Sequence, residues 1–159
     1  MFERILLSTD FSEQAEVAYP WAAKMASIES GSIVLMHALE DDLVATAPVF
    51  AGYMAPGALD LGSYREEFRA GAKRALEAAA ERLRALGATV EPVLVERGKP
   101  SQAIVTTAAE MDCSVIVIST HGRGGLAHLL LGSTAEKVVR TAKVPVLTVH
   151  HDDHAEGAK

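Results

Sequence analysis

Short β-rich apolar runs alternate with longer segments of helical period along the chain, and this alternation restricts the fold more than any other feature. Such alternation is typical of a mainly parallel sheet with helices on both faces. Strands covered on both sides are mostly continuous apolar runs. Five segments fit that description: Ile5 to Thr9, Ile33 to Ala38, Val90 to Val95, Val115 to Ser119 and Val146 to Val149. The sequence therefore predicts an α/β fold, a single doubly wound domain around a five-stranded parallel sheet.

The segment between the first two predicted strands has apolar residues at the i, i+3, i+4, i+7 spacing of a buried helical face. They are Ala18, Trp21, Ala22 and Met25. Ser12 is placed to cap the start of this helix, and Gly31 marks the return turn. Pro20 lies inside the pattern and removes one backbone hydrogen bond, so we expect a kink or a break there.

Three further helices are predicted from the same periodicity. The longest presents a single apolar stripe and ends at Gly87. Its stripe consists of Phe68, Ala72, Leu76, Ala79, Leu83 and Leu86. The next begins at Pro100 with the apolar residues Ile104, Ala108 and Met111, and the last contains Ala135, Val138, Val139 and Ala142.

The segment from Leu39 to Gly62 has no period, contains Pro48 and Pro56, and is longer than connections usually are in compact domains. It follows the second strand, so it leaves the carboxyl edge of the sheet, where ligands bind in open α/β folds. We expect residues 1–150 to form the domain and residues 151–159 to be a disordered polar tail.

The composition argues against several classes of function. A net charge of −6, with no cluster of Lys and Arg among aromatic residues, opposes binding to nucleic acid. No apolar run approaches the roughly 20 residues of a membrane span. Because the start of the chain has no signal-peptide features, we expect a cytoplasmic protein without a membrane partner. Cys113, the single cysteine, excludes an internal disulfide and is interpreted as a small buried apolar residue.

A glycine-rich stretch from Ile118 to Thr134 lies between the fourth strand and the last helix. Glycines let consecutive N–H groups face an anion, and a helix N-terminus offers unpaired N–H groups and a partial positive charge to phosphate. Taken alone, the pattern leaves two interpretations open. It is a phosphate site, or Gly124 and Gly125 serve only a tight turn and Ser133 only caps the helix.

This stretch resembles the nucleotide-binding signature of the universal stress protein family, which is Gly, two residues, Gly, nine residues, then Gly followed by Ser or Thr. Gly122 and Gly132-Ser133 have the nine-residue spacing, whereas Ser119 stands where the signature has its first Gly. The resemblance extends from Ile5 to Glu13 and on to Val144 through Val149. It implies a Rossmann-like fold, similar to the adenine nucleotide alpha hydrolases, with strand order 3-2-1-4-5.

The resemblance also implies an adenine nucleotide, ATP with ADP or AMP as alternatives, and Mg²⁺ accompanying the triphosphate. Asp10 would hold the ribose or base, although an Asx turn or a helix cap is the local alternative. The backbone at Ala38 would read the adenine edge, and Arg123 would add a phosphate contact or remain solvated. The complete implied set is Thr9, Asp10, Ala38, Ser119, His121, Gly122, Arg123, Gly132, Ser133 and Thr134.

Three hypotheses about function follow. The first is a nucleotide-binding module in stress response or signalling, and the second, favoured by Ser119, is a structural homodimer with an empty nucleotide site. The third is an enzyme, but neither a P-loop nor a Ser-Gly-Gly-x-Asp-Ser loop occurs, so we assign no catalytic residue and expect slow ATP hydrolysis at most. No residues have metal-ligand spacing. The resemblance implies a homodimer through Val146 to Val149, unless the charged tail blunts that edge.

Overall fold

The computed structural model describes residues 2–39, 61–96, 98–120 and 131–150. Its centre is a sheet of five parallel strands in the order β3-β2-β1-β4-β5, which confirms the predicted fold and strand order. The strands are β1 (Arg4–Ser8), β2 (Ser32–Ala38), β3 (Thr89–Val95), β4 (Val115–Ser119) and β5 (Val146–Val149). The last two have the predicted bounds, and the first three each begin one residue early.

The central strand β1 pairs with β2 on one side and with β4 on the other, so that Leu6 lies opposite both Val34 and Ile116. The chain moves outward from β1 to β2 and β3, then crosses the sheet to β4 and β5. The strand order therefore reverses between β1 and β4, which is the point where ligands bind in open α/β sheets.

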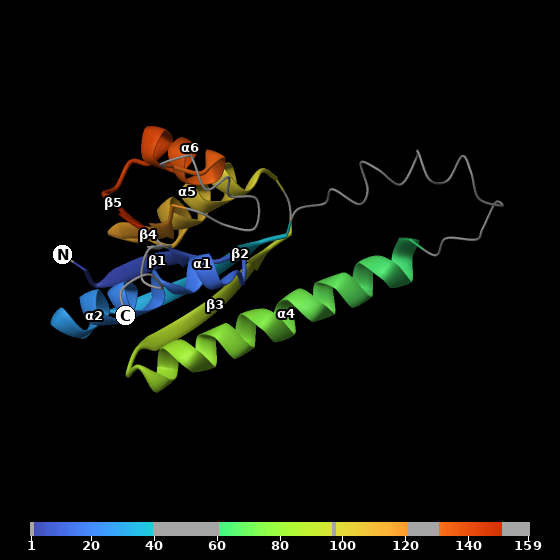
Figure 1. Ribbon diagram of the computed structural model, residues 1–159, viewed down its shortest axis with the longest axis horizontal. Coiled ribbons are helices and arrows are strands. Elements are labelled where there is room, and N and C mark those ends of the chain that lie inside the picture. The colour runs from blue at the N-terminus through green and yellow to red at the C-terminus, as the bar shows by residue number, and fades with distance from the viewer. Residues whose placement is uncertain (1, 40–60, 97, 121–130, 151–159) are drawn as a thin grey trace, which may run out of the picture.

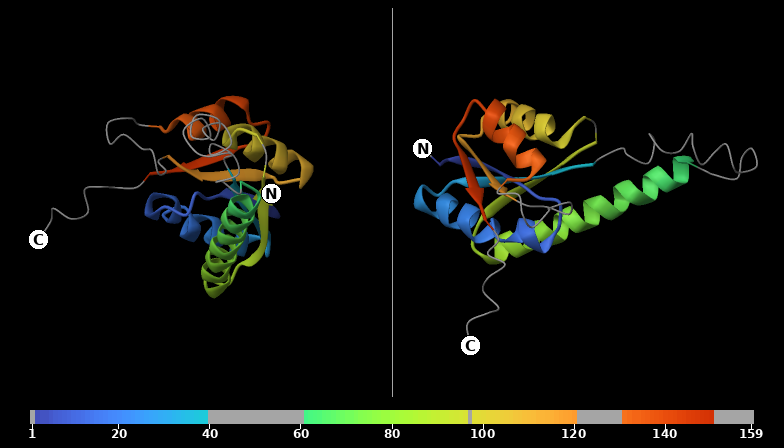
Figure 2. Two further views of the ribbon diagram at one scale, coloured as in Figure 1. Left: turned by 90° about the vertical axis from the view of Figure 1, so that its right-hand side faces the viewer. Right: turned by 45° about the horizontal axis from the view of Figure 1, so that its top comes forward.

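Helices cover both faces of the sheet, as predicted (Figure 1). On one face lie α1 (Glu13–Glu16), α2 (Tyr19–Ile28) and α4 (Leu61–Ala85), and on the other lie α5 (Pro100–Glu110) and α6 (Ser133–Thr141). The two layers are separated in both views of Figure 2. Residues of β1 alternate between the layers, because successive side chains of a strand point to opposite faces.

Pro20 breaks the predicted first helix in two. α1 ends at Glu16 and α2 begins at Tyr19, which places Pro20 in the first turn of α2, where a missing N–H has no intrahelical acceptor to lose. The prediction that Trp21 is buried is wrong, because its side chain is 54% exposed. The buried face of α2 is centred on Ala22 and Ala26, whose small side chains let the helix lie close to the sheet.

The predicted apolar stripe of α4 holds only in its middle. Leu76, Ala79 and Leu83 are buried, whereas Phe68 and Leu86 are 45% and 55% exposed, so the prediction is wrong at both ends. A helix of 25 residues is about 37 Å long, but strands of seven residues span only about 23 Å. The first part of α4 therefore extends past the sheet (Figure 1).

The two ends of α4 can be compared with the predicted helix end at Gly87 and the predicted loop of residues 39–62. Gly87 has a φ of 86° and its N–H bonds to the Arg84 carbonyl, while the Ala88 N–H bonds to the Leu83 carbonyl, so a glycine-based cap ends the helix as predicted. The helix begins at Leu61, inside the predicted loop of residues 39–62. Residues 40–60 of that loop and the tail 151–159 lie outside the described residues.

On the opposite face, α5 begins at Pro100 as predicted. Ala135 and Val138 of α6 are buried, whereas Val139 is 48% exposed. A nine-residue helix that packs against one layer buries a narrow face, and Val139 lies beside it. In the described part of the chain, no helix combines the length and apolar character needed to cross a membrane.

Candidate functional site at the carboxyl edge of the sheet

The carboxyl ends of three neighbouring strands bring the predicted site residues together. Ala38 and Ser119 are the last residues of β2 and β4, and Asp10 follows β1, which lies between those two strands. Strands that run parallel end at the same edge of a sheet. Residues from three distant parts of the sequence therefore meet at the point where the strand order reverses.

Asp10 lies in a tight turn between β1 and α1. Its Oδ1 atom accepts hydrogen bonds from the Ser12 N–H at 3.0 Å and from the Ser12 hydroxyl at 2.5 Å. The same hydroxyl oxygen accepts from the Ala15 N–H at 3.2 Å, so Ser12 caps α1 as predicted. The Asx turn, the local alternative for Asp10, is therefore present, and it fixes one carboxylate oxygen by two bonds.

Thr9 anchors this turn to its surroundings and is only 6% exposed. Its N–H donates to the Met36 carbonyl at 2.9 Å, and its hydroxyl shares a 2.8 Å hydrogen bond with the Tyr19 phenol. The Thr9 hydroxyl oxygen also accepts from the Phe11 N–H at 3.0 Å. Burial raises the pKa of the Tyr19 phenol above its ordinary value, partly offset by the bond to Thr9, so the phenol is neutral at physiological pH.

His37, the residue before Ala38 in β2, reaches the same turn. Its Nδ1 atom lies 2.8 Å from the Thr9 carbonyl oxygen. Because a carbonyl only accepts, Nδ1 donates, which places the proton of the neutral ring on that nitrogen. The His37 ring also lies against Phe11, with the ring centroids 4.2 Å apart. No motif in the sequence assigns a role to His37 or Tyr19, since neither has a spacing that reveals these contacts.

The N-terminus of α6 lies against the end of β4. The Gly132 N–H donates to the Thr120 carbonyl at 2.7 Å, and a Cβ atom on Gly132 would lie 2.8 Å from that oxygen. The φ of Gly132 is −66°, so this position needs glycine for close approach rather than for its backbone torsion. The helix therefore begins at a fixed distance from β4.

Gly132 is the N-cap of α6, and Ser133 is the first helical residue. The interpretation of Ser133 as a helix cap is therefore wrong. The Glu136 N–H donates to the Gly132 carbonyl at 2.9 Å and is the first of the i to i−4 bonds. The N–H groups of Ser133, Thr134 and Ala135 come before it and have no acceptor within the helix, as at any helix N-terminus. Such groups, with the two hydroxyls, suit a phosphate.

Part of the predicted set cannot be placed. His121, Gly122 and Arg123 lie outside the described residues. Thr120, the last described residue before them, is buried, and its hydroxyl lies 3.0 Å from His150 Nδ1.

Among the described residues, no group of three or more His, Cys, Asp or Glu side chains could hold a metal ion. Cys113 is buried, as predicted, and burial raises the pKa of its thiol.

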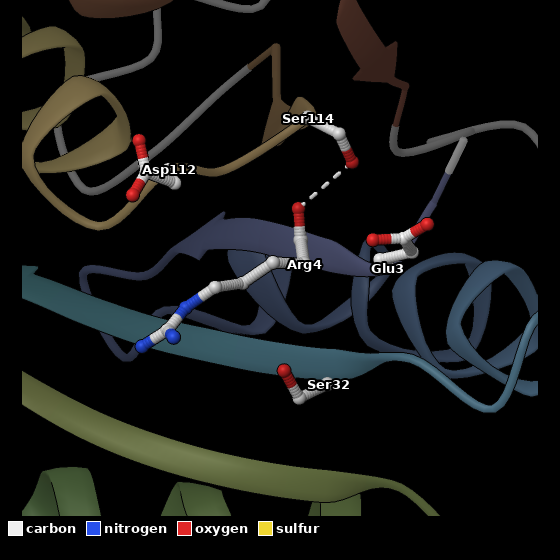
Figure 3. A pocket seen from close by; sticks show the side chains of 5 residues that line it. All are labelled: Glu3, Arg4, Ser32, Asp112 and Ser114. Carbon is white, nitrogen blue, oxygen red and sulfur yellow. Dashed lines mark hydrogen bonds between the residues drawn. The ribbon is translucent and has the colours of Figure 1, made fainter.

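A polar hollow lies at the opposite, amino edge of the sheet (Figure 3). Its volume is about 490 Å³, and its lining is Glu3, Arg4, Ser32, Asp112 and Ser114. The Ser114 hydroxyl donates to the Arg4 carbonyl at 3.0 Å, and the Arg4 guanidinium pairs with Glu91 at 2.5 Å. None of the predicted site residues that the structure describes lines it.

The fold and the carboxyl edge of the sheet define an open, doubly wound α/β protein with its candidate site where the strand order reverses. More specifically, the chain belongs to the universal stress protein family, whose model matches residues 1–150.

Similar proteins support this membership. A universal stress protein of Methanocaldococcus jannaschii is 29% identical over 157 residues, covering 94% of this chain and 95% of the relative. Its solved structure matches with a TM-score of 0.79 and 26% identity over 96% and 99% of the two chains. A universal stress protein from Archaeoglobus fulgidus, solved in complex with dAMP, matches with a TM-score of 0.65 and 27% identity over 93% and 98%. A further universal stress protein, solved in complex with cAMP, matches with a TM-score of 0.64 and 25% identity over 94% of this chain and 97% of that chain.

Proposed function

We propose that this chain binds an adenine nucleotide at the carboxyl edge of its sheet and acts in stress response or signalling. ATP is the proposed ligand, with ADP and AMP as alternatives. The observation that supports it best is the convergence of the Asp10 turn and the N-terminus of α6 on the end of β4. An acceptor for sugar hydroxyls and a group of donors for phosphate thus lie at one edge.

Each proposed role follows from the chemistry of the group. The Asp10 carboxylate accepts hydrogen bonds from a ribose or base, in a turn built by Thr9. The backbone at Ala38 reads the adenine edge, and Ser119 lies beside the ribose. Gly132, Ser133 and Thr134 hold the phosphates together with His121, Gly122 and Arg123. The complexes of relatives with dAMP and cAMP support the binding of an adenine nucleotide, because both ligands combine adenine with a sugar phosphate.

These residues would hold Mg²⁺ mainly by way of the bound nucleotide. Oxygen ligands suit Mg²⁺, and the hydroxyls of Ser133 and Thr134 are the oxygen donors at the start of α6. The metal would therefore be held mainly by phosphate oxygens, whose charge it would offset. We assign no catalytic residue, expect hydrolysis of ATP to be slow at most, and propose a cytoplasmic location.

A second function is favoured by Ser119, which replaces a glycine of the family signature. The Ser119 side chain at the end of β4 either hydrogen-bonds to the ribose or crowds it, and crowding would leave a structural homodimer with an empty site. We propose a homodimer through β5 in either case, because β5 is the outer strand of the sheet next to β4 and such edges pair readily with a second copy.

The first experiment is to denature the purified protein and to identify any released nucleotide by liquid chromatography with mass spectrometry. Calorimetry then measures ATP binding to the wild type and to Asp10→Asn. Loss of a charged acceptor should weaken binding about tenfold or more. Asp112→Asn at the amino edge is the matched control, because Asn tolerates the positive φ of 50° there and should leave binding unchanged. A wild-type chain that releases no nucleotide and binds none would support the empty homodimer.

A further inference from the structure

Tyr19 of α2 and His37 of β2 both hold the turn that contains Asp10, and we propose that they are positioning residues for nucleotide binding. Neither side chain needs to touch the nucleotide for this role, since each would act through Thr9. The inference rests on the proposed function, because it concerns the affinity of the same site.

The contacts of Thr9 carry the argument. Its N–H, its carbonyl and its hydroxyl are all engaged, by Met36, His37 and Tyr19 respectively. Thr9 is therefore tied to β2 by two bonds and to α2 by one. Asp10 is the next residue in the chain, so any displacement of Thr9 moves the backbone from which the Asp10 carboxylate projects.

The turn does not hold its shape through backbone preference alone. Phe11 has a φ of 64°, in the left-handed region that a bulky residue rarely adopts. Such a conformation persists only where neighbouring contacts determine it. Those contacts are the bond from the Phe11 N–H to the Thr9 hydroxyl and the packing of the Phe11 ring against His37. Tyr19 and His37 thus support Phe11 as well as Thr9.

A carboxylate held in place before binding loses less conformational freedom when the ligand arrives, which raises affinity without a new contact. The two supports come from different elements, the start of α2 and the end of β2. Loosening either one should weaken binding while leaving the Asp10 side chain itself intact.

The test measures ATP affinity by calorimetry and thermal stability on the full chain. Tyr19→Phe removes only the phenolic hydroxyl, and the matched control is Tyr64→Phe, at an exposed tyrosine of α4. His37→Leu removes the donor to Thr9, whereas His37→Asn keeps an N–H donor near the position of Nδ1. We expect Tyr19→Phe and His37→Leu to raise the Kd about fivefold, in the range of one lost hydrogen bond, and His37→Asn to restore most of the affinity.

The decisive measurement repeats Tyr19→Phe in the Asp10→Asn background. If Tyr19 acts by positioning the Asp10 carboxylate, the Kd should change less than about twofold there, while the loss of thermal stability should persist. An unchanged Kd for Tyr19→Phe in the wild-type background, with only a lower Tm, would overturn the positioning role and leave the proposed function intact. An equal loss of affinity in both backgrounds would also overturn it. A wild-type chain that binds no adenine nucleotide would overturn the proposed function itself.

Discussion

The two edges of the sheet are both polar, but they present opposite ends of the helices. In this topology each helix begins after the carboxyl end of one strand and ends before the amino end of the next. The N-termini of α5 and α6 therefore lie at the carboxyl edge, and the C-termini of α2, α4, α5 and α6 lie at the amino edge. Helix N-termini favour anions, and C-termini favour cations.

The side chains follow the same division. At the amino edge the Arg4 guanidinium pairs with Glu91 of β3. At the carboxyl edge the Asp10 turn, fixed by Ser12, follows β1, and the N-terminus of α6 lies against the end of the neighbouring strand β4. A hollow of about 490 Å³ at the amino edge is therefore a poorer candidate for a nucleotide than its size suggests. The direction of the helix dipoles favours the carboxyl edge for the proposed nucleotide, because a nucleotide is an anion.

Gly31→Ala should have the largest effect and should be confined to the amino edge. A Cβ atom at Gly31 would lie 2.3 Å from the Phe2 carbonyl oxygen and 2.9 Å from that of Glu3. Both atoms belong to the backbone and cannot turn away, so we expect a loss of about 3 kcal/mol in the free energy of unfolding. Urea unfolding measures this loss, and calorimetry should find the ATP affinity of the folded protein unchanged. A loss below about 1 kcal/mol would show that the backbone at the amino edge moves at little cost to make room for the Cβ atom.

Gly71→Ala is the control for this comparison. Gly71 lies inside α4, where an added Cβ would meet only the Arg74 guanidinium, at 3.9 Å. Replacing glycine by alanine inside a helix should stabilise the fold by about 0.5–1 kcal/mol. A destabilised Gly71→Ala variant would mean that glycine substitutions in this chain do not report local packing.

Gly132→Ala should have a smaller effect on stability but should also weaken binding, unlike Gly31→Ala. The added Cβ would press on the Thr120 carbonyl oxygen from 2.8 Å, and the start of α6 must move to relieve it. We expect a loss of about 1–3 kcal/mol in stability and at least a tenfold rise in the Kd for ATP. If the stability falls while the Kd remains that of the wild type, the phosphates do not lie at the start of α6.

Apolar runs and helical periodicity were enough to predict an α/β fold with five parallel strands, whereas the strand order was implied by the family resemblance. The strands are mostly apolar runs, so β4 and β5 were predicted with their observed bounds, although β5 is an edge strand whose first three residues are only partly buried. The wrong burial predictions for Trp21, Phe68 and Leu86 share one physical cause. Periodicity shows which residues share a helix face, but not how far that face extends along or beside the sheet. α4 is longer than the strands it covers, and that length has no signal in the apolar pattern.

The candidate site was predicted less completely. Family resemblance indicated Asp10 and Gly132, but it could not show that Gly132 is glycine because of its approach to Thr120. The supports of the turn, Tyr19 and His37, lie 10 and 28 residues from Thr9. Contacts at such separations depend on the register of α2 and β2 against β1, which only the folded chain establishes.

Arg4→Met should have the smallest effect of the series and tests whether the amino edge is independent of the nucleotide. The variant removes the ion pair with Glu91, whose side chains are 37% and 55% exposed and therefore well solvated. It also removes the buried Arg4 Nε–H, which finds no acceptor among the described residues. The two changes oppose each other, so we expect the free energy of unfolding to change by less than about 1 kcal/mol. Urea unfolding in low salt and in 1 M salt measures this change, and in 1 M salt the ion pair is screened. The Kd for ATP should not change, and a shift of more than about threefold would mean that the two edges of the sheet are coupled.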